Sequence, residues 1–272
     1  MRWAGYTGGL SRFKLTIEYA GTRYRGWQSQ KNARAVQDEI ANVVRKVSDR
    51  SDFELKGAGR TDAGVHALGQ VAHLDLNTKL TPEALRFALN DNLPADVHVL
   101  AASRVNRSFH ARHDAVARSY LYQIARRRAA LLKPFVWWIK DPLAVAAMRE
   151  AAQECVGFHD FQSFTEVKPE QASTQVKLER LDIAEEGALI LIRVEASHFL
   201  WKMVRRLVGV LAEVGRGKLG ARDVRAFLEA RSETPAGHTA PPSGLFLERI
   251  FYADEPRQHP LRGALFLDKE GR

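Results

Sequence analysis

Hydrophobic and polar residues alternate from Phe13 to Tyr19. A period of two is typical of a half-buried β-strand, so we predict a strand over this stretch. Ala20-Gly21-Thr22 interrupts the alternation. Between Val36 and Val47 the apolar residues recur instead at i, i+4, i+7, i+8 and i+11. That spacing predicts an amphipathic helix.

Strand patterns return after this helix. Two strands are predicted at Phe53–Lys56 and Gly69–Leu76, with a glycine-framed loop between them. The next helix begins at Thr81-Pro82-Glu83, because threonine is a good N-cap and proline suits the first helical position. It is expected to end near Asn90–Asn92, and Asp96–Ser103 is predicted to be a further strand.

The second half of the chain repeats this mixture of elements. We predict strands at Ala117–Ile124, Val176–Ala184, Ala188–Ala196 and Leu245–Phe251, and helices at Leu143–Cys155, Phe199–Val214 and Arg222–Ala230. The middle two strands form a hairpin that turns at Glu185-Glu186-Gly187, and His159-Asp160-Phe161 is placed in a loop. Neither half has the strict strand–helix alternation of a doubly wound fold. The pattern therefore predicts an α+β protein with antiparallel sheets.

The chain of 272 residues is long enough for two domains. We place an N-terminal α+β domain at residues 12–112 and a C-terminal α+β domain at residues 113–272. Residues 1–11 precede the first alternation and are expected to form a loose N-terminal tail, without the apolar segment of a signal peptide. No apolar run approaches the roughly 20 residues that a membrane span needs, so no membrane association is expected.

Positive charge dominates the composition. The chain has 41 Lys and Arg against 32 Asp and Glu, a formal charge of +9, which favours a polyanionic partner. Arginines cluster at Arg104/Arg107/Arg112, Arg126-Arg127-Arg128 and Arg205-Arg206, and Phe109, Tyr120, Tyr122 and Trp201 lie near them in the sequence. Cations beside stacking surfaces suit single-stranded or loop RNA. The alternative is a set of solvated charged faces whose aromatic side chains point into the core.

Several kinds of site are not indicated. Cys155 is the only cysteine, so an internal disulfide or a cysteine-based metal site is excluded, and it is expected to be buried in a helix. A reducing, cytoplasmic setting is the simplest interpretation. His110 and His113 lie among arginines that would repel a cation, so no metal is expected.

A glycine-rich motif at Gly215–Gly220 matches G-x-G-x-x-G. A dinucleotide site needs this motif after a strand and at the start of a helix, but here it follows a predicted helix. Gly215 and Gly217 are therefore interpreted as left-handed helix C-caps. The chain has no Walker A or H-E-x-x-H motif, and we expect no cofactor.

The loop Gly59–Ala67 places Asp62 two residues after Arg60 in a turn bracketed by glycines. An aspartate in a turn is commonly structural, because its carboxylate accepts hydrogen bonds from nearby backbone N–H groups. A carboxylate that faces guanidinium groups instead has a lowered pKa and stays ionised at neutral pH, which suits a nucleophile. The pattern around Tyr120 fits a core tyrosine and a stacking surface equally well. The predicted helix carries Lys202, Arg205 and Arg206 on the side opposite its apolar residues. These cations form either an ordinary solvated face or part of a site.

Gly59–Ala67 also resembles the signature loop of the TruA-type tRNA pseudouridine synthases. Other segments that resemble this family are Tyr19-Ala20-Gly21-Thr22, Gly26-Trp27-Gln28, Val36-Gln37, Ala117-Arg118-Ser119-Tyr120, His159-Asp160-Phe161, Phe199-Leu200, Met203-Val204-Arg205 and Gly244-Leu245. These segments extend from about Phe13 to Tyr252, nearly the whole chain. The resemblance implies two similar α/β-sandwich (RRM-like) domains whose antiparallel sheets join into one central sheet, with a basic active-site cleft between them.

The resemblance further implies an isomerase that converts uridine to pseudouridine in the anticodon stem-loop of tRNA, at positions 38–40 in tRNA numbering. The expected partner is tRNA, and a homodimer is expected. Two alternatives are kept: a non-catalytic tRNA-binding or RNA-folding module, and a pseudouridine synthase that acts on another RNA.

The same resemblance assigns roles to five residues. Asp62 is the essential carboxylate, and the sequence leaves open whether it attacks C1′, attacks C6 of uracil or deprotonates the sugar. Tyr120 is expected to stack on the flipped uracil, and Arg205 to keep Asp62 ionised. Arg60 is expected to assist base extrusion or to fill the space that the base vacates. Leu245 is expected to form a wall of the pocket.

Overall fold

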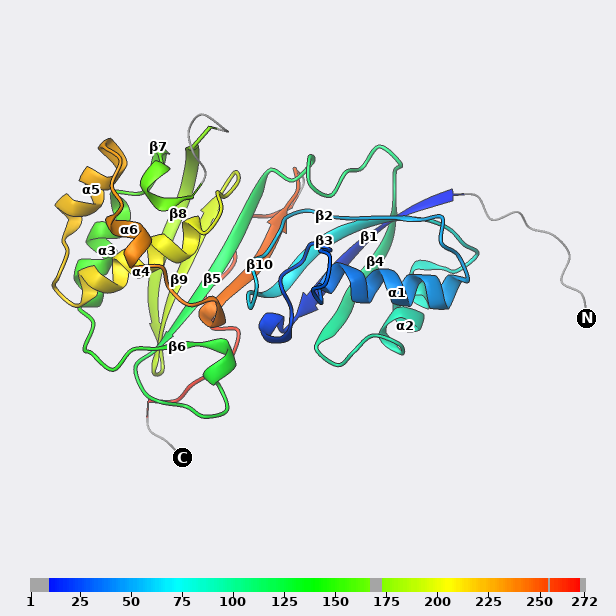
Figure 1. The fold of residues 1–272 in the computed structure, drawn as a ribbon, viewed down its shortest axis with the longest axis horizontal. Helices are drawn as coiled ribbons and strands as arrows, with labels where there is room; N and C mark the ends of the chain where they lie inside the picture. Colours follow the sequence, from blue (N-terminus) through cyan, green and yellow to red (C-terminus); the bar gives the residue numbers. More distant parts are fainter. Residues whose placement is uncertain (1–9, 167–172, 254, 270–272) are drawn as a thin grey trace, which may run out of the picture. The chain divides into compact units, whose positions relative to one another are not determined.

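The computed structural model describes residues 10–166, 173–253 and 255–269 (Figure 1). The chain divides into two compact units, Met1–Ala115 and Val116–Arg272. Each unit combines a largely antiparallel sheet with helices, so the predicted α+β class is confirmed. The expected N-terminal tail lies mostly outside the described residues, and the first strand already begins at Leu10.

The first unit contains four strands and two α-helices within its described residues. They are β1 (Leu10–Tyr19), η1 (Gly21–Arg23), α1 (Val36–Ser48), β2 (Glu54–Gly57), β3 (His66–Asn77), α2 (Pro82–Asn90) and β4 (Val97–Val105). β1 lies between β4 and β3, and β2 pairs with β3; all these pairings are antiparallel. Both predicted helices are confirmed.

Alternation along β1 creates one side of the first core. Phe13, Leu15 and Ile17 are completely buried, whereas the residues between them are not. The buried side chains of α1 include Val36 and Ile40 and complete this apolar layer. α2 begins as predicted, since the Thr81 hydroxyl accepts a hydrogen bond from the Ala84 N–H at 3.1 Å.

The second unit has a five-stranded antiparallel run in the order β10-β5-β9-β8-β7, with β6 parallel to the end of β5. Its strands are β5 (Ala117–Ala125), β6 (Trp137–Trp138), β7 (Gly157–Asp160), β8 (Gln175–Glu186), β9 (Leu189–Ala196) and β10 (Leu245–Phe251). Its helices are η2 (Lys133–Phe135), α3 (Val145–Gln153), η3 (Gln162–Phe164), α4 (Met203–Gly215), α5 (Ala221–Glu229), α6 (Thr234–Gly237) and η4 (Pro242–Gly244).

The two faces of this second sheet have different chemistry. One face is apolar and includes Tyr122, which lies opposite Ile192 in the β5–β9 register. The other face carries Arg193 and Glu248, whose side chains form a two-pronged ion pair with N–O distances of 2.8 and 2.6 Å. The predicted apolar strand at residues 188–196 therefore contains a buried guanidinium.

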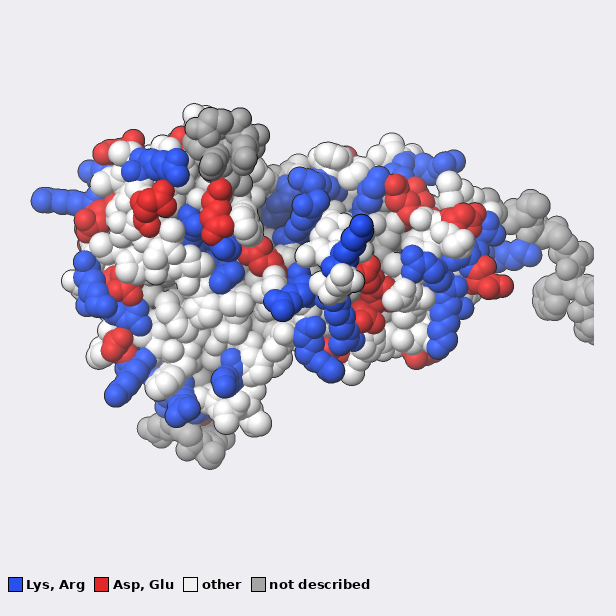
Figure 2. Space-filling model, in the orientation of Figure 1, with Lys and Arg blue, Asp and Glu red and all other residues white. Residues whose placement is uncertain are grey.

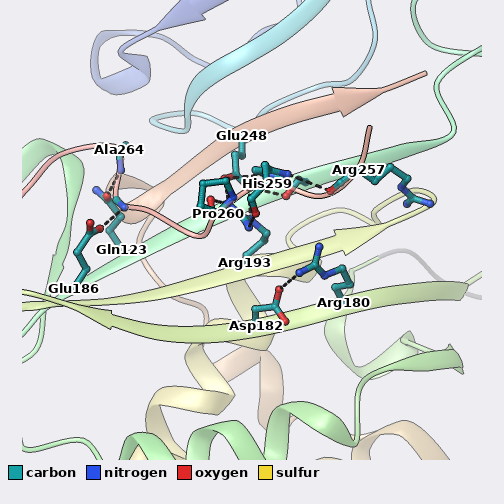
Figure 3. Close-up of polar contacts among 12 residues, drawn as sticks. Gln123, Arg180, Asp182, Glu186, Arg193, Glu248, Arg257, His259, Pro260 and Ala264 are labelled. Carbon is teal, nitrogen blue, oxygen red and sulfur yellow. Dashed lines mark hydrogen bonds and ion pairs between the residues drawn. The ribbon is translucent and has the colours of Figure 1, made fainter. Parts of the chain in front are cut away.

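Residues 257–268 cover this polar face (Figure 3). Arg193 donates hydrogen bonds to the carbonyl oxygens of His259 and Pro260, at 3.0 and 2.8 Å. Gln123 accepts a hydrogen bond from the Ala264 N–H at 2.7 Å. The buried polar groups Arg193 and Gln123 are thus paired in part with the backbone of this C-terminal segment.

Several predicted boundaries are wrong. His159 and Asp160 belong to β7 and not to a loop, because they pair with the start of β8. Phe199–Lys202 is not helical: α4 begins at Met203, after Lys202 in the left-handed conformation with φ of 61°. The hairpin turn is also later than predicted, since β8 continues to Glu186.

Only one of the two glycines predicted to cap the helix does so. Gly217 follows α4 with a left-handed φ of 74°, as expected for a cap. Gly215 is instead the last residue of α4, where a Cβ would crowd the side chains of Leu143 and Met148. Its role is close packing. Cys155 is buried as expected, in the turn just after α3, and burial raises its pKa to about 12.

Candidate active site

Asp62 lies in the segment that joins β2 to β3, and its N-terminal neighbour is anchored in the core. The buried Thr61 hydroxyl is hydrogen-bonded to the Tyr19 hydroxyl at 2.8 Å. The Thr61 carbonyl oxygen accepts a hydrogen bond from the Trp27 N–H at 3.2 Å. Because both the side chain and the backbone of Thr61 are held, the position at which Asp62 leaves the core is defined.

A tight turn follows Asp62. The Val65 N–H donates to the Asp62 carbonyl oxygen at 3.1 Å, and the Gly64 N–H donates to the Tyr24 carbonyl oxygen at 3.2 Å. Gly64 has a φ of 79°, a left-handed conformation that glycine adopts without strain. Val65 is buried while Asp62 is partly exposed. The turn therefore presents the carboxylate from a rigid base.

Two glycines let the segment after β1 approach this loop. A Cβ on Gly21 would collide with the Val65 carbonyl group, and a Cβ on Gly26 would collide with the Thr61 carbonyl oxygen. Gly26 also has a φ of 98°. Trp27 is almost fully buried beside the loop, against Gly57. The Gly21 and Gly26-Trp27 segments noted in the sequence are therefore part of the support of Asp62.

Further polar contacts fix both ends of the loop. The Gln70 side-chain amide donates to the Gly59 carbonyl oxygen at 2.9 Å. His66 Nδ1 accepts a hydrogen bond from the Gly21 N–H at 3.0 Å, which places its ring proton on Nε2 when the ring is neutral. Burial raises the pKa of Tyr19 well above its usual value, so its hydroxyl keeps its proton. His66 is already in β3, so the predicted loop ends two residues early.

Arg60 lies on the same loop as Asp62 and is exposed. Lys and Arg side chains are spread over the drawn faces of both units, with Asp and Glu among them (Figure 2). An exposed arginine next to a partly exposed carboxylate is suited to contact an anionic substrate such as RNA.

Tyr120 and Tyr122 lie on the same face of β5 but differ in accessibility. Tyr122 is completely buried, its hydroxyl donates to the Pro241 carbonyl oxygen at 2.8 Å, and burial raises its pKa. Tyr120 is partly exposed, and its ring meets Phe199 edge to face with centroids 5.0 Å apart. Tyr122 is therefore a core residue, while Tyr120 has a ring that is supported from one side.

Arg205 and Arg206 have different surroundings, although the sequence pattern placed both opposite the apolar side of the helix. The Arg205 Nε donates to the Ala240 carbonyl oxygen at 2.7 Å, and the Ala240 N–H donates back to the Arg205 carbonyl oxygen at 3.0 Å. Arg206 is only 5% exposed and donates to the Thr165 carbonyl oxygen at 2.6 Å. The interpretation of Arg206 as part of a solvated face is wrong.

Leu245 is the first residue of β10 and is buried opposite Tyr122. It lies five residues after Ala240, the partner of Arg205. The second unit therefore holds three of the predicted site residues, Tyr120, Arg205 and Leu245. The first unit holds Asp62 and Arg60.

Sequence reasoning missed the residues that position Asp62. Tyr19 and Thr61 appeared only as parts of longer segments and were given no role, although their hydroxyl groups are hydrogen-bonded inside the core. The available signal was the aromatic residue at the end of a predicted strand, immediately before a glycine-containing break. Gln70 was missed as well. A glutamine in a strand indicates a structural role only when it is buried, and its burial is not visible in the sequence.

Histidines also meet in the first unit. The rings of His73 and His110 are 4.7 Å apart, and those of His110 and His113 are 4.2 Å apart. Nitrogen atoms of two of these rings accept backbone hydrogen bonds, His73 from Ala111 and His110 from Arg112. Over the residues that the structure describes, no three His, Cys, Asp or Glu side chains are arranged to hold a metal ion. Within the same residues, no helix has the length and apolar character to cross a bilayer.

Comparison with known proteins gives one consistent result. A family model described as tRNA pseudouridine synthase matches residues 15–114 and 151–253. A protein of Agrobacterium fabrum named tRNA pseudouridine synthase A is 43% identical over 92% of this chain and 97% of its own length. Proteins of the same name from Beijerinckia indica and Afipia carboxidovorans are 45% and 44% identical, over 90% and 89% of this chain and 95% and 100% of their own lengths. The chain belongs to the tRNA pseudouridine synthase family.

Proposed function

We propose that this protein isomerises uridine to pseudouridine in the anticodon stem-loop of tRNA, at positions 38–40 in tRNA numbering. The observation that carries the proposal is the partly exposed Asp62 on a loop held by the Tyr19–Thr61 hydrogen bond. A rigid scaffold that presents one carboxylate on a loop is a common setting for a catalytic group. The loop lies within the family match.

The reaction changes the connectivity of the nucleotide but not its composition. The N1–C1′ bond breaks, the uracil rotates, and C5 bonds to C1′; the proton leaves C5 and N1 gains one. In this proposal Asp62 is the carboxylate that acts on the nucleotide. No oxidant, reductant or group donor is needed, so the chemistry requires only groups that this chain carries.

The other four residues bind the substrate or support Asp62 in this proposal. Tyr120 stacks on the flipped uracil, with Phe199 supporting its ring from the side. Arg205, oriented by the Ala240 carbonyl oxygen, stabilises the ionised form of Asp62. These roles require residues of both units to act on the same nucleotide.

Arg60 and Leu245 complete the proposed site. Arg60 is exposed beside Asp62 and assists base extrusion, a step that costs a few kcal/mol. Leu245 forms an apolar wall next to Tyr122. The protein is proposed to act as a homodimer in the cytoplasm, where tRNA is available. Sedimentation with and without tRNA tests the dimer, and a monomer in both conditions would contradict it.

The test replaces Asp62 by asparagine, which removes the charge and keeps the shape. With tRNA labelled by tritium at C5 of uridine, the wild-type protein is expected to release tritium, and Asp62→Asn to release none while binding tRNA with the wild-type affinity. Asp52→Asn is the matched control, because Asp52 is an exposed carboxylate of the same unit. Turnover by Asp62→Asn would remove Asp62 from the mechanism.

The same assay separates the two alternatives. A wild-type protein that binds tRNA but releases no tritium is a binding or folding module. Modification mapped outside positions 38–40, or in another RNA only, identifies a synthase of different specificity.

A further inference from the structure

A basic surface lies in the loop that follows β5. Residues 126–140, here called the basic loop, carry five Lys and Arg and no Asp or Glu. The same 15 residues include Phe135, Trp137 and Trp138. Since the whole chain has a formal charge of +9, this loop holds a large part of the positive excess. None of the residues proposed for catalysis or uracil binding lies in it.

The basic loop has a defined backbone within the second unit. η2 and β6 lie inside it, and β6 pairs with the end of β5 through Ile124 and Ala125 (Figure 1). The Ile139 N–H donates to the Ala125 carbonyl oxygen at 3.0 Å. The buried Gln123 donates to the Phe135 carbonyl oxygen at 3.0 Å. Its side chains are therefore presented from a fixed frame, as a binding surface needs.

The five cations of the basic loop fall into two groups. Arg126 forms an ion pair with Glu185, and the Arg127 Nε donates to the Asp268 carbonyl oxygen at 2.8 Å, so both have structural partners. Arg128, Lys133 and Lys140 are exposed. Across the described part of the chain, none of these three forms an ion pair with a carboxylate. Their charges are available to an external anion.

Apolar side chains are exposed beside these three cations. Trp138 is 40% exposed and Leu131 is 91% exposed. The Arg128 guanidinium lies 5.4 Å from the centroid of the Trp138 ring. An accessible tryptophan next to arginine and lysine combines a stacking surface with phosphate-binding charge, which is the chemistry that proteins use to hold RNA.

This surface is separated from the proposed uracil site. Tyr120 and Ala125 are five residues apart on β5, which corresponds to about 17 Å along an extended strand. Trp138 pairs with Ala125 and so lies at the far end of that strand. One nucleotide does not cover this distance, so a ligand on the basic loop is a different part of the RNA from the nucleotide that reacts.

We propose that the basic loop binds the sugar–phosphate backbone of tRNA outside the anticodon stem-loop. Arg128, Lys133 and Lys140 contact phosphates, and Trp138 stacks on a base or packs on a ribose. The inference rests on the proposed function for the identity of the RNA. An anionic lipid surface has similar charge, but membership of a tRNA pseudouridine synthase family favours RNA.

The test compares two triple variants that remove the same charge. Arg128→Ala/Lys133→Ala/Lys140→Ala alters the basic loop, and the control Lys218→Ala/Arg222→Ala/Arg231→Ala removes three exposed cations elsewhere in the second unit. Dissociation constants are measured against salt for full-length tRNA and for the isolated anticodon stem-loop. The basic-loop variant is expected to bind tRNA about tenfold more weakly, with a log–log salt slope smaller by about 2–3, as three lost phosphate contacts require.

Further results are expected. The isolated stem-loop binds the basic-loop variant as it binds wild type, kcat at saturating tRNA is unchanged, and the control variant keeps most of the wild-type affinity and slope. Trp138→Ala alone weakens tRNA binding about tenfold, while Trp138→Phe restores most of it. Equal effects on tRNA and on the stem-loop, or equal effects of the two triple variants, would overturn the proposal.

Two additional outcomes keep this proposal distinct from the proposed function. If the wild-type protein forms no pseudouridine but the expected binding differences appear, the basic loop stands and the enzymatic assignment falls. If the wild-type protein is active but the two triple variants bind tRNA equally, the enzymatic assignment stands and the proposal for the basic loop falls. Vesicles of equal parts phosphatidylcholine and phosphatidylglycerol test the lipid alternative. Loss of vesicle binding with unchanged tRNA binding would overturn the proposal in favour of a membrane.

Discussion

His73 is expected to make the stability of the protein depend on pH. It lies in β3 with 0% exposure, and its Nδ1 accepts a hydrogen bond from the Ala111 N–H at 3.1 Å. Within the described residues its Nε2 has no hydrogen-bond partner. Burial, with the positive charge of Arg12 nearby, lowers the pKa of His73 to about 4. A proton added to this ring would place an unpaired charge in the core.

The size of the effect follows from proton linkage. In the unfolded chain a histidine has a pKa near 6.5, so below that pH the unfolded state binds more protons than the folded state, and stability falls as the pH falls. Between pKa values of 6.5 and about 4, the loss is about 1.4 kcal/mol at pH 5.5. It approaches about 3 kcal/mol once the pH is below 4, where the folded state is protonated too.

The perturbation is His73→Asn, which keeps an oxygen acceptor for the Ala111 N–H but does not titrate. Urea unfolding is measured for both proteins at about pH 8 and about pH 5.5, and the wild type is expected to lose about 1.4 kcal/mol more than the variant between the two. His98→Asn is the control, because it makes the same replacement at an exposed position of the same unit. Parallel pH dependence of the wild type and His73→Asn would refute the reasoning.

Two further substitutions test the packing around the proposed site and the polar sheet face. Gly26→Ala forces a side chain into a φ of 98° and against a carbonyl oxygen, so we expect a loss of about 1–3 kcal/mol in unfolding free energy and a fall in activity. Gly59→Ala is the control, because a Cβ at Gly59 meets open space, and it should change neither the unfolding free energy nor the activity. If the two variants had the same unfolding free energy, the collision at Gly26 would be relieved. Glu248→Gln weakens the pair that neutralises the buried Arg193, and we expect a cost of about 3–5 kcal/mol in denaturant unfolding. Asp182→Asn breaks an exposed pair and should cost less than about 1 kcal/mol; a similar value for both would contradict the burial argument.

Local periodicity was sufficient where each element buries one regular face. β1 and α1 lie within a few residues of the predicted ranges, because their burial follows the two-residue and the 3.6-residue repeat. The start of α4 was not predictable in this way. Phe199-Leu200-Trp201 fits the apolar pattern of a helix, but the Trp201 carbonyl oxygen accepts a hydrogen bond from the Thr165 hydroxyl, from a segment distant in sequence.

At the candidate site, too, local patterns were visible in the sequence and long-range contacts were not. The types and spacing of residues around Asp62 were visible in the sequence, and so was the resemblance to a family. The support of the loop by Tyr19 depends on a contact across 42 residues, which no local pattern reveals. Arg206 shows the opposite limit: helical spacing predicts a solvent-facing side chain, but the guanidinium is buried and donates hydrogen bonds to the carbonyl oxygens of Ser163 and Thr165.

The cover over the polar sheet face has a consequence for how the protein is made. Arg193 is synthesised well before the carbonyl groups of His259 and Pro260 that accept its hydrogen bonds. During translation the polar face of the second sheet therefore stays hydrated until residues 257–268 have left the ribosome. The first unit has all its strands by Val105 and can fold earlier. Folding on the ribosome is thus expected in two stages, with closure of the second unit delayed until residues 257–268 are available.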